Sequence, residues 1–278
     1  MPKTEPDKSR AFITCPFNLI VNNYLGKILS ERLSPEIALN GTILDEFKTQ
    51  SFRRVARIFK KEGIPCTVHA PFTDISIGAV DKKARALAVE RLKKALDIAA
   101  AFGACSMVFH TGFDERHYLG FKDLWLENAK ASLDTLCAEA EYRKVPIMLE
   151  NVFEPSPDIH MALFAAAEAK TLGFCLDIGH VRVFSKTSLA AWLEALWRRI
   201  EQLHLHDNLG QKDDHLPIGA GVLDFDALIS FLSSKGTSPL ITLEPHREED
   251  LAQAIQGLNG LLARFPAFKP RLPSRPLP

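Results

Sequence analysis

Eight short apolar runs alternate with longer segments of helical period along the chain. Each run is short enough for a strand, and each connection is long enough for the crossover helix that parallel strands require. The runs lie at residues 11–16, 36–39, 65–70, 105–110, 145–150, 173–177, 200–206 and 240–244. A strand–helix unit repeated eight times is typical of the (β/α)8 TIM barrel, which takes about 250 residues. We therefore predict an α/β fold, a single (β/α)8 TIM barrel.

Helical spacing is clearest in two of the connecting segments. One apolar stripe advances by three and four residues and so occupies one helix face: it consists of Leu126, Ala129, Leu133, Leu136 and Ala140. The same spacing recurs over residues 189–200, after a serine-containing stretch at 185–188 that can cap a helix. Both segments are predicted to be helices that cover the barrel.

The chain is predicted to comprise one barrel domain, residues 1–265, and a proline-rich C-terminal tail, residues 266–278. Five of the thirteen tail residues are proline, which lacks a backbone donor and disfavours helix. Their PxxP-like spacing is also compatible with docking in an aromatic groove of a partner. We expect the tail to lie along the barrel or to extend into solvent.

Charge and composition exclude several classes of protein. Lys plus Arg and Asp plus Glu number 34 each, so no overall positive field attracts nucleic acid or anionic membrane. No uncharged run reaches the roughly 18 residues of a membrane span, and the first ten residues lack an apolar core. The five cysteines are isolated and are predicted to be reduced core residues. A soluble, cytoplasmic protein is the expectation.

Polar residues able to bind metal end successive apolar runs or follow them closely. They are His69, His110, Glu150, Asp177, His180, His204, Asp213, His215 and Glu244. In a parallel barrel the carboxyl ends of the strands converge on one mouth, where active sites of this fold lie. Burying several carboxylates together is costly unless a cation compensates their charge. Imidazole and carboxylate ligands without thiolate suit Zn²⁺, Mn²⁺, Co²⁺ or Mg²⁺, so we predict a divalent-metal site.

Strand alternation agrees with this placement, because His69 shares parity with Thr67 whereas Val68 faces the other way. Further histidines are expected to face the mouth, and the residues predicted to contact substrate are His69, His110, His206 and His246. Gly219 and Gly221 in the PIGAG segment predict a turn and not a phosphate loop. The two remaining histidines, His117 and His160, are predicted to lie on the surface.

The ordered motifs VHAPF, LEN, LDIGH, HLHDN and TLE resemble those of the xylose isomerase-like TIM-barrel superfamily. This superfamily contains sugar phosphate isomerases and epimerases and the endonuclease IV family, and the resemblance extends over residues 68–246. It implies that one divalent ion is held by Glu150, Asp177, His204 and Glu244. It also implies that Glu150 and Glu244 transfer protons through a metal-stabilised enediolate, with His180 on a substrate oxygen. The expected activity is isomerisation or epimerisation of a small polyhydroxylated sugar or hydroxy-keto compound, with a homodimer possible.

Three alternatives remain open. All nine candidate ligands match the endonuclease IV family in order and type, which implies up to three zinc ions and hydrolysis at abasic DNA sites. Against this, Asp214 stands where that family has arginine, TDISIG replaces its bulky DNA-wedging segment, and the net charge is zero. A related sugar or cyclitol dehydratase would begin with the same proton abstraction. A barrel that only binds ligands is disfavoured, because both acid–base glutamates are present.

Overall fold

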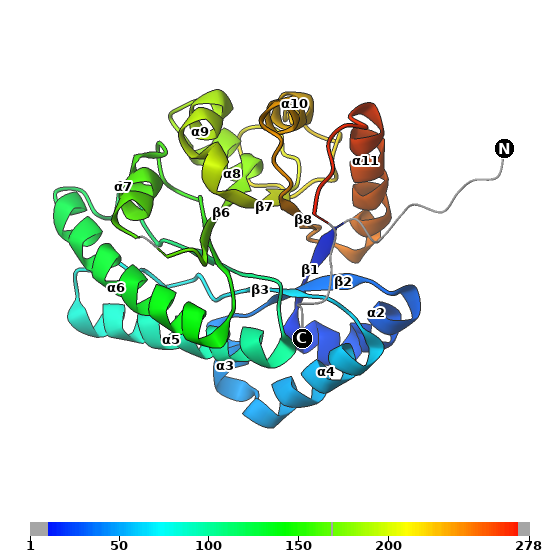
Figure 1. Ribbon diagram of the computed structural model, residues 1–278, viewed down its shortest axis with the longest axis horizontal. Coiled ribbons are helices and arrows are strands. Elements are labelled where there is room, and N and C mark those ends of the chain that lie inside the picture. Colours follow the sequence, from blue (N-terminus) through cyan, green and yellow to red (C-terminus); the bar gives the residue numbers. More distant parts are fainter. Residues whose placement is uncertain (1–10, 168, 272–278) are drawn as a thin grey trace.

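The computed structural model describes residues 11–167 and 169–271, and it shows eight parallel strands closed into a barrel. Helices surround the strands on the outside (Figure 1). Each strand pairs with the next in chain order, and β8 pairs with β1 to close the ring. The predicted TIM barrel is confirmed.

The strands begin and end within one or two residues of the predicted bounds. They are β1 (Phe12–Pro16), β2 (Ser34–Ala38), β3 (Thr67–His69), β4 (Met107–His110), β5 (Ile147–Glu150), β6 (Leu172–Asp177), β7 (Ile200–Leu205) and β8 (Leu240–Leu243). The first helical segments are α1 (Phe17–Leu19), a π-helical turn (Ile20–Tyr24), α2 (Leu25–Glu31), α3 (Gly41–Glu46) and α4 (Thr49–Glu62). Then come α5 (Lys82–Phe102), α6 (Lys122–Arg143), α7 (Asp158–Ala166), α8 (Ile178–Phe184), α9 (Leu189–Leu196), α10 (Phe225–Lys235) and α11 (Leu251–Arg264). Two 3₁₀ turns, Trp197–Arg199 and Glu248–Asp250, precede β7 and α11.

Local sequence explains where several helices begin and end. The predicted serine cap of α9 is Ser188, whose side chain accepts a hydrogen bond from the Ala191 N–H. Asp81 caps α5 by accepting hydrogen bonds from the Lys83 and Ala84 N–H groups. Helix α5 ends at Gly103, which takes the left-handed conformation that glycine adopts without strain.

Alternation along the strands separates two apolar regions. Side chains that point outward, such as Val68, Phe109 and Leu243, belong to the large core between the strands and the helices. Inside the barrel, Val108, Met148 and Cys175 form a separate small cluster. The predicted alternation is therefore confirmed, and other inward positions of the strands carry the polar groups of the mouth.

A buried polar network lies inside the barrel below the strand ends. Gln202 Nε2 donates to Glu36 Oε2 at 2.8 Å and to Thr242 Oγ1 at 3.0 Å. Thr67 Oγ1 also donates to Glu36 Oε2, at 2.8 Å, and Ser106 Oγ donates to Gln202 Oε1 at 2.6 Å. Because barrels of this type are usually filled by branched apolar side chains, this network is a specialised floor beneath the mouth.

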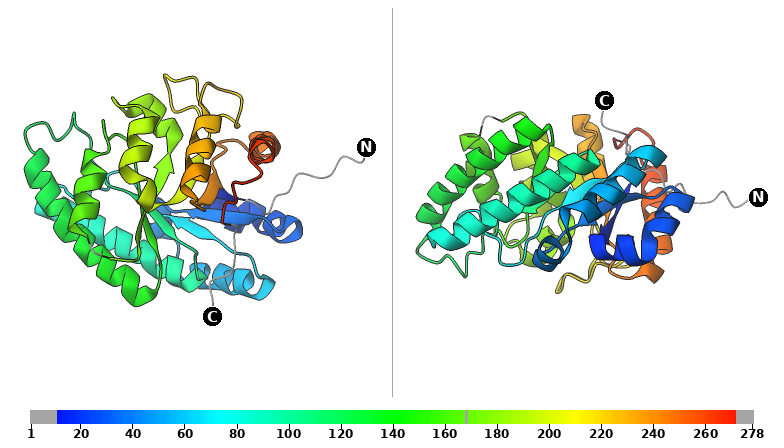
Figure 2. Two further views of the ribbon diagram at one scale, coloured as in Figure 1. Left: turned by 45° about the horizontal axis from the view of Figure 1, so that its top comes forward. Right: turned by 90° about the horizontal axis from the view of Figure 1, so that it is seen from below.

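The long loop between β7 and α10 is organised by one carboxylate. Asp207 accepts backbone N–H bonds from Asn208, Gly219, Gly221 and Leu223 at 2.9–3.1 Å. Gly219 has a φ of +89°, and a Cβ at Gly221 would lie 2.3 Å from Asp207 Oδ1, so both glycines are required by the turn. The loop projects beyond the strand ends, as its yellow trace shows (Figure 2, left).

Part of the proline-rich segment packs on the barrel. Phe268 is buried, and the Arg271 N–H donates to the Pro239 carbonyl at 3.0 Å. Residues 272–278 of the predicted tail lie outside the described part of the chain. Within residues 11–167 and 169–271, no helix combines the length and apolar character needed to cross a bilayer.

Replacing Gly221 with alanine is expected to displace the loop that follows β7. The new methyl group would meet Asp207 Oδ1 and the Asn208 carbonyl at 2.3 Å, an overpacking that costs about 1–3 kcal/mol. Hydrogen exchange over residues 208–223 should accelerate in the Gly221→Ala variant. Gly260→Ala is the matched control, because no atom lies within 4 Å of its added Cβ. Equal protection of the loop in both variants would contradict the anchoring role of Asp207.

Candidate metal centre

Glu150 lies at the centre of the barrel mouth, where three strands bring imidazoles to one carboxylate. Its Oε2 is 3.1 Å from His69 Nε2 and 3.0 Å from His110 Nε2, and its Oε1 is 3.1 Å from His204 Nδ1. The side chain is buried, with 1% of its surface exposed. Burial raises the pKa of Glu150, but His204 and His110 outweigh it and hold that pKa well below its ordinary range. The group is therefore a carboxylate with both oxygens directed at imidazole nitrogens.

The first potential ligand group contains His69, His110 and Glu150, whose ligand atoms lie within 4.8 Å of one another. Each donor comes from the end of its own strand, β3, β4 or β5. His69 Nδ1 lies 2.9 Å from the Ala70 carbonyl, which orients the ring and directs Nε2 toward Glu150. Such an arrangement leaves Nε2 available to an ion, as metal-binding histidines require.

The second group is defined by contacts to His204 and contains Glu150, His204 and Glu244 of the predicted single-ion set; Glu36, His204 and Glu244 also form a potential ligand group. His204 Nδ1 is 3.1 Å from Glu150 Oε1 and 3.2 Å from Glu244 Oε1. Asp177, the fourth residue of that set, lies between this group and the next. Its Oδ1 accepts the His180 N–H at 2.8 Å and so caps α8, while its Oδ2 is 3.0 Å from His206 Nε2.

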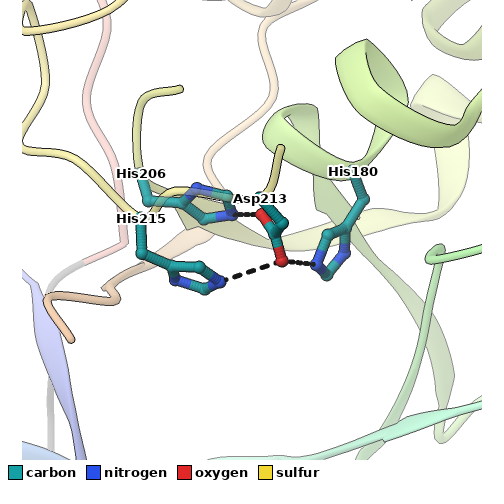
Figure 3. Close-up of side chains that lie close together, drawn as sticks. All are labelled: His180, His206, Asp213 and His215. Carbon is teal, nitrogen blue, oxygen red and sulfur yellow. Dashed lines mark hydrogen bonds and ion pairs between the residues drawn. The ribbon is translucent and has the colours of Figure 1, made fainter. Parts of the chain in front are cut away.

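The third group contains His180, His206, Asp213 and His215. The three imidazoles surround the Asp213 carboxylate (Figure 3). Asp213 Oδ2 is 3.1 Å from His215 Nε2 and 3.3 Å from His180 Nε2. Asp213 Oδ1 is 3.6 Å from His206 Nε2. These residues come from α8, the end of β7 and the loop that Asp207 anchors, so this group depends on that loop.

His206 and His246 are predicted to contact substrate; the structure brings the first into a potential ligand group and leaves the second at the rim of the mouth. His206 lies among the potential ligands, because residues 204 and 206 share the inward parity of β7. His246 is exposed at the rim, and its ring stacks on His215 with centroids 3.7 Å apart. His215 itself has a φ of +50°, a left-handed conformation that is uncommon for a residue with a side chain.

The predicted position of His160 is wrong. It is fully buried on α7, where its ring packs against Phe174 and Trp192. Its Nε2 lies 3.3 Å from the backbone carbonyl of Glu150. A lone histidine in a helix gives no sign of burial, and the aromatic partners that cover it come from β6 and α9. His117 is exposed, as predicted.

Glu36 is the principal site residue that the sequence analysis missed. The expected strand began at Glu36, whereas β2 begins at Ser34 and places Glu36 inside the barrel. Its side chain is fully buried, and its Oε1 is 3.1 Å from His204 Nε2. Correct alternation from residue 34 would have placed Glu36 on the same inward face as Ala38.

The residues fit a divalent cation on their own chemistry. The mouth collects the carboxylates of Glu150, Asp177, Asp213 and Glu244 among imidazoles, and buried negative charge is costly without a compensating cation. Asp213 Oδ1 is buried without a hydrogen-bond partner among the described residues, and its carboxylate is still 26% exposed toward the mouth. Burial lowers the pKa of His180, but Asp177 and other nearby carboxylates raise it to about 10. Oxygen and imidazole donors of this kind suit zinc, manganese or cobalt.

Several known proteins are similar to this chain. MJ1311 of Methanocaldococcus jannaschii is 26% identical over 206 residues, which cover 72% of this chain and 70% of that protein. A probable endonuclease 4 of the Aster yellows witches'-broom phytoplasma is 27% identical over 185 residues, 59% of this chain and 61% of that protein.

Solved structures share the barrel over most of its length. The TTHB071 protein from Thermus thermophilus, soaked with ZnCl2, is 28% identical with a TM-score of 0.74, covering 92% of this chain and 98% of that one. A D-tagatose 3-epimerase-like protein shares the fold with a TM-score of 0.79 at 24% identity, covering 91% and 97%. The family model described as xylose isomerase-like TIM barrel matches residues 35–262. This chain therefore belongs to the xylose isomerase-like TIM-barrel family.

Proposed function

We propose that this protein is a divalent-metal-dependent isomerase or epimerase of a small polyhydroxylated compound. The observation that carries the proposal is the pair of carboxylates Glu150 and Glu244, which approach the same nitrogen of His204 at 3.1 and 3.2 Å. Glu150 ends β5 and Glu244 directly follows β8, and these two strands are not neighbours in the barrel. Two carboxylates brought in from separate strands can address different faces of one small substrate.

The ion would be held by Glu150, Asp177, His204 and Glu244. When bound, a divalent ion polarises a carbonyl and its adjacent hydroxyl and makes the neighbouring C–H more acidic. Glu244, 9% exposed and nearer the opening than Glu150 at 1%, is assigned the proton transfer at the substrate carbon. Glu150 is assigned the complementary transfer, and His180 is assigned to hydrogen-bond a substrate oxygen.

Burial and charge support a small substrate. Asp177 and His204 are fully buried, so only a compact group reaches them. Two arginines near the mouth are already paired: Arg116 with Asp114 at 2.7 Å and Arg247 with Asp250 at 2.8 Å. Binding of a nucleic-acid backbone requires several Lys or Arg side chains that can neutralise its phosphates. Arginines already paired with carboxylates contribute little to such binding.

The third ligand group favours a second candidate, hydrolysis of a phosphodiester by several ions. The ligands of an epimerase need only one group, whereas His180, His206, Asp213 and His215 form a further complete set. Several clustered ions would supply hydroxide and stabilise both oxygens of an in-line displacement. The similarity to a probable endonuclease 4 and to the zinc-soaked TTHB071 protein supports testing this activity with zinc.

The number of ions per chain separates the two candidates. We expect elemental analysis of untagged protein, reconstituted with zinc or manganese, to give close to one tightly held ion if the chain is an isomerase. A value close to three would favour the hydrolase, and abasic-site DNA would then be the first substrate to test. A protein that binds no ion after reconstitution would refute both candidates.

Glu150→Gln is expected to lower the amount of bound ion and to abolish turnover, because a neutral amide replaces a carboxylate in contact with three imidazoles. Turnover is measured as exchange of carbon-bound hydrogen with D2O on a panel of ketoses and keto-acids. Glu154→Gln is the control. Glu154 is also buried, with 2% of its surface exposed, but it accepts a hydrogen bond from the Val152 N–H and belongs to none of the three ligand groups. Full activity in the Glu150→Gln variant would remove Glu150 from the mechanism.

Replacing Asp213 and His215 together with alanine tests the third group. In a multi-ion hydrolase this double variant should lose ions and activity by orders of magnitude, because two of four donors are removed. In a one-ion epimerase the ion count should stay constant, and KM should change more than kcat. Lys212→Ala, an exposed neighbour in the same loop, controls for general loop disturbance.

A further inference from the structure

Glu36 is a buried carboxylate to which the proposed reaction assigns no part. It lies on β2 with no exposed surface, one layer below the ligand atoms of the mouth. A buried carboxylate is costly unless hydrogen-bond donors and positive charge compensate it, so the groups around Glu36 indicate what holds it there. Its neighbours show that it is held in one orientation, with one oxygen directed at a candidate ligand.

Three donors fix one oxygen of Glu36. Oε2 accepts from Thr67 Oγ1 at 2.8 Å, from Gln202 Nε2 at 2.8 Å and from Thr242 Oγ1 at 3.1 Å. These donors come from β3, β7 and β8, so the carboxylate is tied to three other strands of the barrel. Oε1 remains, and it lies 3.1 Å from His204 Nε2 and 3.5 Å from Thr14 Oγ1.

His204 has two nitrogens with opposite surroundings. Nδ1 faces Glu150 and Glu244, the carboxylates of the second ligand group. Nε2 is buried and makes no aligned hydrogen bond, but Glu36 Oε1 stands at hydrogen-bond distance from it. A neutral imidazole that binds an ion through one nitrogen carries its proton on the other. Glu36 Oε1 is therefore the acceptor placed to take the proton of an ion-bound His204 after a small rotation of either side chain.

We propose that Glu36 is a positioning residue: its Oε1 accepts the Nε2–H of His204 and so selects the tautomer whose Nδ1 lone pair binds the ion. Carboxylates that orient metal-binding histidines in this way commonly contribute 10–100-fold to metal affinity. The inference rests on the metal centre of the proposed function and not on which reaction occurs there. Glu36 also belongs to a potential ligand group with His204 and Glu244. It is assigned the positioning role because three protein donors hold its Oε2, while its Oε1 faces His204 Nε2 and not the Nδ1 that Glu150 and Glu244 approach.

Ion affinity tests the proposal directly. Zinc affinity is measured by competition with a chromophoric chelator on the wild type, Glu36→Gln and the control Glu154→Gln. The Glu36→Gln variant should bind zinc about 10–100-fold more weakly with the same number of ions at saturation. The control should match the wild type. Unchanged affinity in Glu36→Gln would overturn the proposal, and so would the loss of one whole ion, which would make Glu36 a ligand.

Nitrogen-15 NMR of histidine-labelled protein gives a readout that a purely structural role would not move. In the zinc-loaded wild type His204 should carry its proton on Nε2, with a downfield signal that shifts or disappears in Glu36→Gln. A proton on Nδ1 would overturn the proposal. If the wild type binds no ion, the metal-dependent function fails, yet the Nε2 proton signal still reports whether His204 contacts Glu36.

A second variant covers the case in which Glu36→Gln does not fold. Thr242→Val removes one donor to Glu36 Oε2 without touching any of the three ligand groups. It should weaken zinc binding in the same direction by a smaller factor, with the ion count unchanged. Wild-type affinity in folded Thr242→Val, together with an unshifted Nε2 proton signal, would contradict the proposal.

Discussion

The mouth of this barrel depends on how buried negative charge is compensated. Glu150 is nearly inaccessible to water, and it is stable there as a carboxylate because imidazoles from β3, β4 and β7 surround it. Each of these strands must therefore bring a polar inward side chain to the mouth. The register places His110 beside Glu150 and Asp177 beside His204, whereas His69 pairs with Val108 and Glu150 with Cys175, so the ligand positions are staggered by two residues across those two pairs. Below the mouth, the buried carboxylate of Glu36 is likewise compensated, by hydrogen-bond donors from β3, β7 and β8.

Much of this arrangement could be predicted from the sequence. Apolar runs that end in a polar residue reveal strand ends, and the closed barrel brings all strand ends together, so the nine candidate ligands could be named before their geometry was known. Their division into three groups could not be predicted. It depends on α8, which starts at its cap Asp177, and on a loop whose course is determined by contacts with Asp207.

Two individual errors have physical causes. Glu36 was expected to begin its strand, because Pro35 interrupts the apolar run at that point. The strand in fact begins two residues earlier, where Ser34 and Pro35 pair with β1. His160 was assigned to the surface because its aromatic partners are distant in sequence. In both cases the missing information was long-range pairing, which a local pattern does not contain.

The loop after β7 has a further consequence. Asp207 holds it through backbone N–H groups, and apart from the two glycines these contacts place no demand on side-chain identity. Residues 209–212 lie at its outer edge, where Leu209, Gln211 and Lys212 are exposed. New side chains there would change what approaches the mouth without altering how Asp213 and His215 are held. This loop is thus a part of the barrel where the surroundings of the mouth can diverge between relatives, or be re-engineered, at little cost to the candidate ligands.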